Sequence, residues 1–142
     1  MLAAIALTAA TFLLVGMSHF LVLSRGLPIV SSMARTLETR HFLLLTLIGL
    51  LHIGEALIFA IVFEVAQGMD LGAFKAEAPL DFMDVYYFSI VNYTTLGLGD
   101  IYPAGHLRFM AGVQSLLGFL LLSCSASHLF SLNQSKAERL GG

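Results

Sequence analysis

This sequence of 142 residues is poor in charged side chains, has one cysteine and shows no excess of basic residues. Charged residues make up 11% of the chain, whereas soluble domains carry roughly 25%. The single cysteine, Cys124, rules out an intrachain disulfide framework. The net charge of −2 gives no broad basic surface for nucleic acid. These shortages exclude a soluble domain, a disulfide-stabilised fold and a nucleic-acid-binding protein.

Long apolar runs take the place of the missing charges. Hydrophobic residues make up 58% of the chain, and the mean hydropathy is +0.88. A helix that crosses a bilayer needs about 20 apolar residues, and the segments 1–23, 42–66 and 107–132 meet that length. The first segment lacks the basic leader of a signal peptide, so we interpret it as a transmembrane helix. The sequence therefore predicts an all-α integral membrane protein with three transmembrane helices.

Basic residues are concentrated in two short segments, the linker 24–41 and the tail 133–142. These segments carry Arg25, Arg35, Arg40, Lys136 and Arg139 against Glu38 and Glu138. Short basic loops stay in the cytoplasm. We therefore expect a multi-pass protein of the cell inner membrane, with its N-terminus outside and its C-terminus cytoplasmic. The linker opens with "SRGLPIV", which we interpret as the end of the first helix, before an amphipathic segment on the membrane face.

The stretch between the second and third apolar runs would lie outside, and it contains a shorter apolar piece, "LDFMDVYYFSIVNYTT". Asp81 is a candidate helix cap, and Asp84 supports the first turn. A helix over 82–93 rises roughly 18 Å, which is only part of the ~30 Å hydrocarbon core. The strip 95–99 that follows spans at most about 17 Å when extended. These lengths predict a re-entrant loop.

The strip itself is rich in small residues, with two threonines, two glycines and an aspartate in "TTLGLGD". The two glycines let alternate residues adopt backbone conformations closed to other side chains, so that successive carbonyls can face one way. Rings of carbonyls replace the water around a dehydrated cation. Non-helical backbone at membrane depth survives where it is buried in protein or lines water. The strip is therefore predicted to be buried in protein or to line water.

This loop resembles the pore loop of potassium channels, whose filter reads TVGYG followed by Asp. The residues from Thr95 to Asp100 occupy the corresponding positions. The chain looks most similar to small bacterial potassium channels, with the first helix as an addition. The resemblance implies a pore domain at 42–132, with an outer helix at 42–66, a pore helix at 81–94, a filter at 95–100 and an inner helix at 107–132.

The resemblance also implies roles for individual residues. Backbone carbonyls of the filter would bind K⁺ at Thr95, Leu96, Gly97 and Leu98, with Gly99 completing the filter. Filter support and the outer mouth would involve Thr94, Asp100, Tyr87 and Tyr93. One chain supplies a quarter of each carbonyl ring, so the implied assembly is a homotetramer with a four-fold symmetric pore in membrane lipid. Conduction would be passive, with permeant K⁺ and without an enzymatic step, a cofactor or a small-molecule substrate.

Two departures from the family pattern leave the ion selectivity open. Leu96 replaces the usual valine or isoleucine, and Leu98 replaces a tyrosine whose hydroxyl braces the filter in the family. Tyr86, Tyr87 and Tyr93 on the pore helix are candidates to compensate. We expect potassium conduction, with a weakly selective K⁺/Na⁺ channel as the alternative.

Two further functions share parts of this pattern. The letters "LGLGDI" also resemble the GxGD motif of intramembrane aspartyl proteases, in which Asp100 would be catalytic. Such chemistry needs a second aspartate in another spanning helix, whereas Asp70, Asp81 and Asp84 all lie in the external segment. The other alternative is a non-conducting accessory subunit that assembles with a true channel.

The inner helix carries candidates for gating. Gly112 and Gly118 are hinge candidates, although glycine also serves close packing of membrane helices. His128, near the cytoplasmic end, is a pH-sensing candidate because four imidazoles would repel each other there on protonation.

The second apolar run carries an ionisable pair, His52 and Glu55, on one helix face. Ionisable residues inside a membrane are functional candidates, so this pair is a second pH-sensing candidate. The competing interpretation is a structural contact with the first helix through His19 or Ser18.

Overall fold

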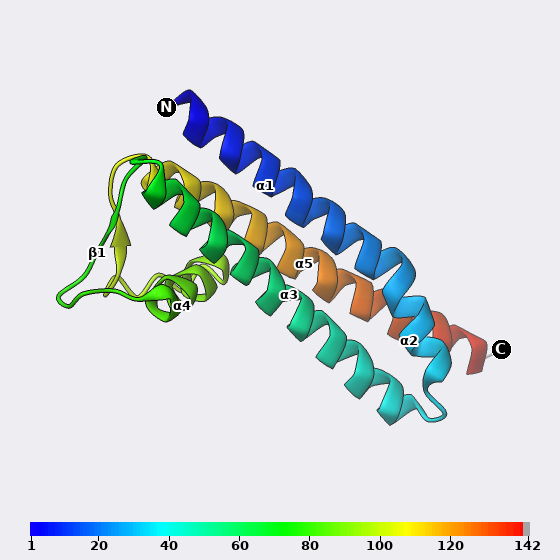
Figure 1. Cartoon of the computed structure of the whole chain (residues 1–142). Coiled ribbons are helices and arrows are strands. Elements are labelled where there is room, and N and C mark those ends of the chain that lie inside the picture. Colours follow the sequence, from blue (N-terminus) through cyan, green and yellow to red (C-terminus); the bar gives the residue numbers. More distant parts are fainter. Residues whose placement is uncertain (141–142) are drawn as a thin grey trace.

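Three long helical rods run side by side, and a short helix and a small hairpin lie beside one half of them (Figure 1). The computed structural model describes the backbone of residues 1–140 and the side chains of residues 1–131. Within that part, the stretches long and apolar enough to cross a membrane are Leu2–Met33, Leu37–Gly68 and Leu107–Ser131. The short helix between the second and third is α4 (Phe82–Tyr93). The all-α fold with three transmembrane helices, predicted from composition, is confirmed.

The sequence predicts that the first span ends near residue 23, but the span continues beyond it. Helix α1 (Leu2–Leu21) continues through a π-helical turn, η1 (Val22–Gly26), into α2 (Leu27–Met33). Pro28 has no backbone N–H, and in a regular α-helix its ring clashes with the carbonyl four residues earlier. The wider turn just before Pro28 relieves that clash. The proline therefore changes the helical pitch without ending the rod.

The predicted basic linker 24–41 is mostly helical as a consequence. Only residues 34–36 lie outside helices between α2 and α3 (Leu37–Gly68). The side-chain oxygen of Thr36, the N-cap of α3, accepts a hydrogen bond from the Thr39 backbone N–H at 3.2 Å. This cap starts the second span earlier in the chain than the predicted outer helix at 42–66.

Helix α5 (Leu107–Leu140) begins at the predicted residue and runs past the predicted end at 132. Its continuation covers most of the predicted tail 133–142. That stretch contains glutamine, lysine, alanine, glutamate, arginine and leucine, which favour a helix. The inner helix and the tail are therefore one backbone element through Leu140.

A two-stranded antiparallel sheet joins the two ends of the segment between α3 and α5. Strand β1 (Phe74–Lys75) pairs with β2 (Tyr102–Pro103). The register is Phe74 with Pro103 and Lys75 with Tyr102. Beside the sheet, Gly72 and Gly105 have φ values of 153° and 63°, and a Cβ at Gly72 would overlap the carbonyl oxygen of Ala104. The close crossing of the two chain segments therefore requires glycine there.

Aromatic rings hold α4 against α3. The ring centroid of Phe88 on α4 lies 5.7 Å from that of Phe63 on α3 and 4.6 Å from that of Phe74 on β1. The Ser89 hydroxyl on α4 also donates a hydrogen bond to the Ala56 carbonyl of α3 at 2.6 Å. Apolar packing and a directed hydrogen bond together set the position of the short helix along the longer one.

The N-terminus and the segment between α3 and α5 lie at the same end of the molecule, whereas the turn at 34–36 lies at the other end (Figure 1). A hollow at the first end is lined by Met1, Ala4, Ile5, His106 and Phe109. Large apolar side chains along the rods, including Leu13, Phe42 and Phe130, are exposed. Outward apolar side chains suit helices surrounded by lipid or by other copies of the chain.

Candidate ion pathway

The N-terminal end of α4 is fixed by a reciprocal pair of hydrogen bonds. The Asp81 carboxylate accepts from the Asp84 backbone N–H at 3.1 Å, and the Asp84 carboxylate accepts from the Asp81 backbone N–H at 2.8 Å. This capping box satisfies two backbone donors and places negative charge at the positive end of the helix. The cap predicted from the sequence is confirmed.

The C-terminal end of α4 is closed by a residue in a left-handed conformation. Thr95 has φ = 63°, its backbone N–H donates to the Asn92 carbonyl at 3.0 Å, and the N–H of Leu96 donates to the Val91 carbonyl at 3.0 Å. Glycine usually occupies such a position, and a β-branched residue there carries a cost of about 1–2 kcal/mol. The chain therefore accepts backbone strain to place a threonine at the start of the strip.

Left-handed residues recur at every second position along the strip. Thr95, Gly97 and Gly99 have φ values of 63°, 58° and 81°, whereas Leu96 and Leu98 between them do not have positive φ. An alternation of this kind turns successive peptide carbonyls toward one side, which a regular strand does not do. The sequence-based expectation that glycine would permit alternating backbone conformations agrees with these angles, and Thr95 adds a third such position.

The whole strip from 94 to 100 is exposed in the single chain. Leu96 is 63% exposed and Leu98 is 57% exposed, although both are apolar. After the Leu96 N–H, the next hydrogen bonds that hold the strip to the rest of the chain are those of Asp100 at its far end. Non-helical backbone at membrane depth must be covered by protein or face water. One copy of the chain therefore leaves the strip uncovered.

At the far end of the strip, Asp100 is held by a side chain of α4. The Tyr87 hydroxyl donates to one Asp100 carboxylate oxygen at 2.9 Å, and the Ile101 N–H donates to the other at 3.0 Å. The hydrogen bond to Asp100 raises the pKa of the Tyr87 hydroxyl above its usual value. Asp100 and Glu77 also line a hollow beside Gly99. Negative charge therefore gathers at the end of the strip.

The three tyrosines considered as braces for the filter have different partners. Tyr87 contacts Asp100, Tyr86 donates to the Ile53 carbonyl at 3.1 Å, and Tyr93 donates to the Glu55 carboxylate at 2.6 Å. Only Tyr87 among them is hydrogen-bonded to the filter segment 95–100, and it holds Asp100, the last residue of that segment.

Polar side chains join α4 to α5. The Asn92 amide donates to the Ala111 carbonyl at 2.8 Å and to the Gln114 side-chain oxygen at 2.7 Å. The Gln114 amide in turn donates to the Ser89 hydroxyl at 2.6 Å. An amide at the centre of an otherwise apolar run was the available signal, because buried polar groups need partners.

The two glycines proposed as hinges differ in their surroundings. A Cβ at Gly118 would overlap the carbonyl oxygen of Tyr93, so α5 passes close to the end of α4 there. At Gly112 no described atom lies within 4 Å of an added Cβ. Close packing supplies a reason for glycine at 118, whereas the structure offers no such reason at 112. Both stay predictions as hinges.

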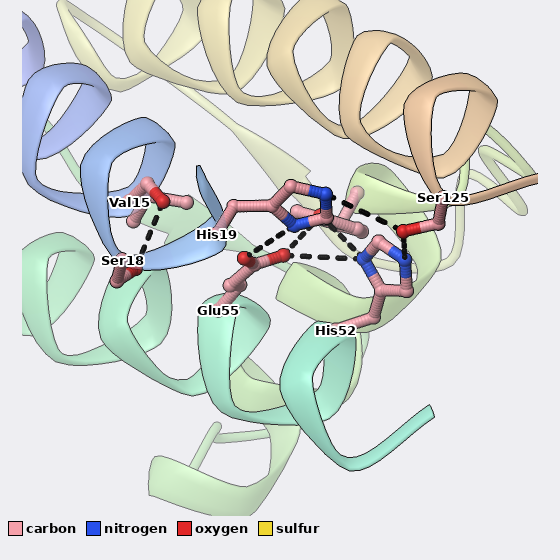
Figure 2. Close-up of polar contacts among 7 residues, drawn as sticks. Val15, Ser18, His19, His52, Glu55 and Ser125 are labelled. Atoms are coloured by element: carbon pink, nitrogen blue, oxygen red, sulfur yellow. Dashed lines mark hydrogen bonds and ion pairs between the residues drawn. The ribbon is translucent and has the colours of Figure 1, made fainter. Parts of the chain in front are cut away.

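The ionisable pair on α3 lies in a buried cluster with His19 of α1, Tyr93 of α4 and Ser125 of α5. Figure 2 shows His19, His52, Glu55 and Ser125 pointing toward one another. His19 Nδ1 lies 2.9 Å from one Glu55 carboxylate oxygen, and His52 Nδ1 lies 3.1 Å from the other. The Ser125 hydroxyl lies between the two imidazoles, 3.1 Å from His52 Nε2 and 3.3 Å from His19 Nε2. Tyr93 completes the cluster through its bond to Glu55 and lies 2.9 Å from His52 Nδ1.

The contact with the first helix matches one of the two sequence-based candidates. His19 reaches Glu55, whereas the Ser18 hydroxyl donates to the Val15 carbonyl of its own helix at 2.8 Å. The other pH-sensing candidate, His128, is half-buried further along α5. The sensing roles of these residues stay predictions.

The fold and the loop define a multi-pass membrane protein with a re-entrant segment between its last two spans. A sequence model of an ion channel family matches residues 47–135, and the chain belongs to that family. The match runs from α3 through the loop to α5 and leaves α1 and α2 outside it. No curated protein and no solved structure matches the chain significantly. The resemblance drawn from the filter residues is confirmed at the level of the family.

Family membership also bears on the protease alternative. An ion channel family favours passive ion movement over covalent chemistry. Asp100 is hydrogen-bonded to Tyr87, and Asp81 and Asp84 are used in the helix cap. These carboxylates therefore have structural partners that suit a pore loop.

Proposed function

We propose that four copies of the chain form a potassium channel, in which K⁺ passes through rings of carbonyls from Thr95, Leu96, Gly97 and Leu98, with Gly99 completing the filter. The observation that carries this proposal is the alternation of φ along an exposed strip. A dehydrated ion needs oxygens on all sides. One strip offers carbonyls from one side only, so the remaining oxygens come from other copies around a shared axis.

Electrostatics support a cation as the permeant ion. The C-terminal end of a helix carries partial negative charge, and α4 ends at the start of the strip. Glu77 and Asp100 place carboxylates at the other end. Partial or full negative charge therefore lies at both ends of the proposed filter, which favours cations over anions.

The proposed orientation follows from charge and from the arrangement of the rods. The basic turn region and the end of α5 lie away from the N-terminus and the re-entrant loop (Figure 1). Basic segments next to membrane helices stay in the cytoplasm. We place the N-terminus and the loop outside the cell inner membrane and the C-terminus in the cytoplasm.

The direct test is ion flux from the purified chain in liposomes. We expect K⁺ efflux down a gradient, abolished in protein-free liposomes, and a four-copy mass for the detergent-solubilised assembly. Absence of flux from an assembly that is folded and membrane-inserted would support the accessory-subunit alternative and contradict the proposal.

Selectivity requires a separate measurement, because the observed Tyr87–Asp100 bond does not brace position 98. We expect the reversal potential under bi-ionic K⁺/Na⁺ conditions to favour K⁺, and Leu98→Tyr, which carries the residue common in the family, to widen the preference. Equal permeability of the unaltered chain would instead establish the weakly selective channel.

A further inference from the structure

The buried cluster of His19, Glu55, His52, Tyr93 and Ser125, called here the polar cluster, has features that a simple structural contact does not need. It draws one or two side chains from each of α1, α3, α4 and α5 (Figure 2). Glu55 is 1% exposed, His19 2% and Ser125 3%. No buried side-chain nitrogen or oxygen among the described residues lacks a hydrogen-bond partner. A closed set of bonds allows the protons in it to be counted.

The count begins at the carboxylate. Tyr93 donates its proton to one Glu55 oxygen. The Nδ1–H of His52 is shared between that oxygen and the Tyr93 hydroxyl oxygen, and the Nδ1–H of His19 donates to the other Glu55 oxygen. If each imidazole carries only that proton, both Nε2 atoms face Ser125 as acceptors. A single hydroxyl has one proton and satisfies only one of them. A carboxylate with two neutral imidazoles therefore leaves one link of the polar cluster open.

One additional proton closes that link, in either of two arrangements. On an imidazole, it lets that ring donate to the Ser125 oxygen while the Ser125 hydroxyl donates to the other ring. On Glu55, it lets the carboxyl donate to His19 Nδ1, and the His19 Nε2–H then donates to Ser125. Both arrangements give the polar cluster a total charge of zero. A buried group in apolar surroundings is most stable when its total charge is zero and all its hydrogen bonds are made.

A metal ion fits the same atoms less well. His19, His52 and Glu55 offer nitrogen and oxygen atoms within 4.8 Å of one another. Hydrogen bonds within the polar cluster already engage those atoms. A divalent cation beside one carboxylate would also leave a net positive charge among buried apolar side chains. A proton is the ligand that completes the cluster and leaves it neutral.

The polar cluster is positioned to act on the filter. Tyr93 lies two residues before Thr95, the first of the proposed ion-binding residues, and its carbonyl packs against Gly118 of α5. Ser125 of the same helix α5 holds the two imidazoles. The cluster therefore ties the end of the pore helix to the inner helix at two places. His52, 12% exposed, is the most exposed side chain of the polar cluster.

From this geometry we infer that the polar cluster is a proton-binding site that holds one exchangeable proton and whose release lowers conduction. When the proton leaves, a buried negative charge and an open link to Ser125 remain, and the contact between α4 and α5 weakens. The titratable groups that face the Glu55–His52 pair of α3 are His19 from α1 and Tyr93 from α4, whereas α5 contributes only the uncharged Ser125. This inference rests on the proposed channel function and adds its regulation.

The first test is the pH dependence of K⁺ flux from the full chain in liposomes, with equal pH on both sides. We expect flux to fall by about tenfold as pH rises from about 6 to about 9, since one lost buried hydrogen bond shifts an equilibrium by roughly that factor. In Glu55→Gln the amide donates to His19 without an exchangeable proton, so this variant should conduct at every pH in the range. The matched control, Glu64→Gln on the same helix, should keep the fall.

Two results with variants would overturn the proposed link between proton release and conduction. One is an unchanged pH response in Glu55→Gln. The other is loss of the response in His128→Asn with its retention in Glu55→Gln, because His128 lies outside the polar cluster. A conducting chain whose flux does not vary with pH contradicts it equally.

A second measurement counts the proton in the unaltered protein and does not depend on flux or on a variant that folds. Nitrogen NMR of histidine-labelled protein in liposomes distinguishes N–H from bare nitrogen in each ring. At about neutral pH we expect either three N–H groups on His19 and His52, or two together with an infrared band of a protonated carboxyl. Two N–H groups with an ionised Glu55 would refute the proton site. A chain that does not conduct would contradict the proposed channel but would not change the number of N–H groups. The channel proposal and the proton-site proposal can therefore fail independently.

Discussion

The filter strip at 94–100 and the polar cluster are neighbours in the chain, but they differ in how complete they are within one copy. The strip is exposed throughout and holds left-handed residues at alternate positions. The polar cluster is buried or half-buried, and each of its polar atoms has a partner within the chain. One copy therefore completes the hydrogen bonding around the end of α4, whereas it leaves the proposed ion-binding strip exposed.

The two regions also differ in whether the backbone or the side chains carry the proposed function. In the strip the side chains at 96 and 98 are exposed leucines, and the backbone conformation carries the proposed function. In the polar cluster the side-chain chemistry carries it, because proton counting depends on each imidazole and hydroxyl. Substitutions at glycine should therefore affect the strip, and conservative polar substitutions should affect the cluster.

The largest effect is expected from Gly97→Ala. Gly97 has φ = 58°, where an alanine costs about 1–2 kcal/mol in each copy, and a tetramer carries that cost four times. We expect K⁺ flux in liposomes to fall by about 100-fold or more. Gly49→Ala, at an exposed helical glycine with no atom near an added Cβ, is the matched control and should conduct normally. Equal flux from both variants would contradict the proposed role of the strip in ion binding.

An intermediate effect is expected from Ser125→Ala in the polar cluster. The substitution leaves the Nε2 atoms of both imidazoles without their shared partner, which costs about 1–3 kcal/mol of unfolding free energy. Ser123→Ala on the same helix removes an exposed hydroxyl that bonds only to the Phe119 carbonyl, so its effect should stay within about 0.5 kcal/mol. Thermal unfolding in detergent measures both, and similar melting temperatures would contradict the buried role of Ser125.

The smallest effect is expected from Tyr87→Phe, which removes the bond to Asp100 at the edge of the strip. Tyr87 is exposed, so we expect a several-fold change in flux with no loss of folding. The neutral hydroxyl makes the bond, and its pKa is raised, so the bond is fully present below the ordinary tyrosine pKa of about 10 and is lost only above it. Titration of Tyr87 should therefore add no pH dependence to the flux of the unaltered chain below about pH 10. Tyr102→Phe, at another exposed tyrosine of this segment, is the control.

Several elements could be predicted because their causes are local. The cap by Asp81 and Asp84 depends on residues three apart, and the spans depend on the length of apolar runs. The continuation through Pro28 could not be predicted, because a short π turn relieves the proline clash and leaves no clear pattern in the letters. The predicted break at 24–41 was wrong for that reason.

The sequence by itself determined three membrane helices, a short capped helix and a glycine-containing strip, since hydropathy, capping and backbone freedom act over a few residues. Tertiary structure alone decided that Tyr93 and Ser125 would join His19, His52 and Glu55. Those residues come from four helices up to 106 positions apart in the chain, between His19 and Ser125. A polar side chain in an apolar run indicates that it has a partner, because an unpaired buried polar group costs free energy. Only the packing of the helices selects which residue that partner is.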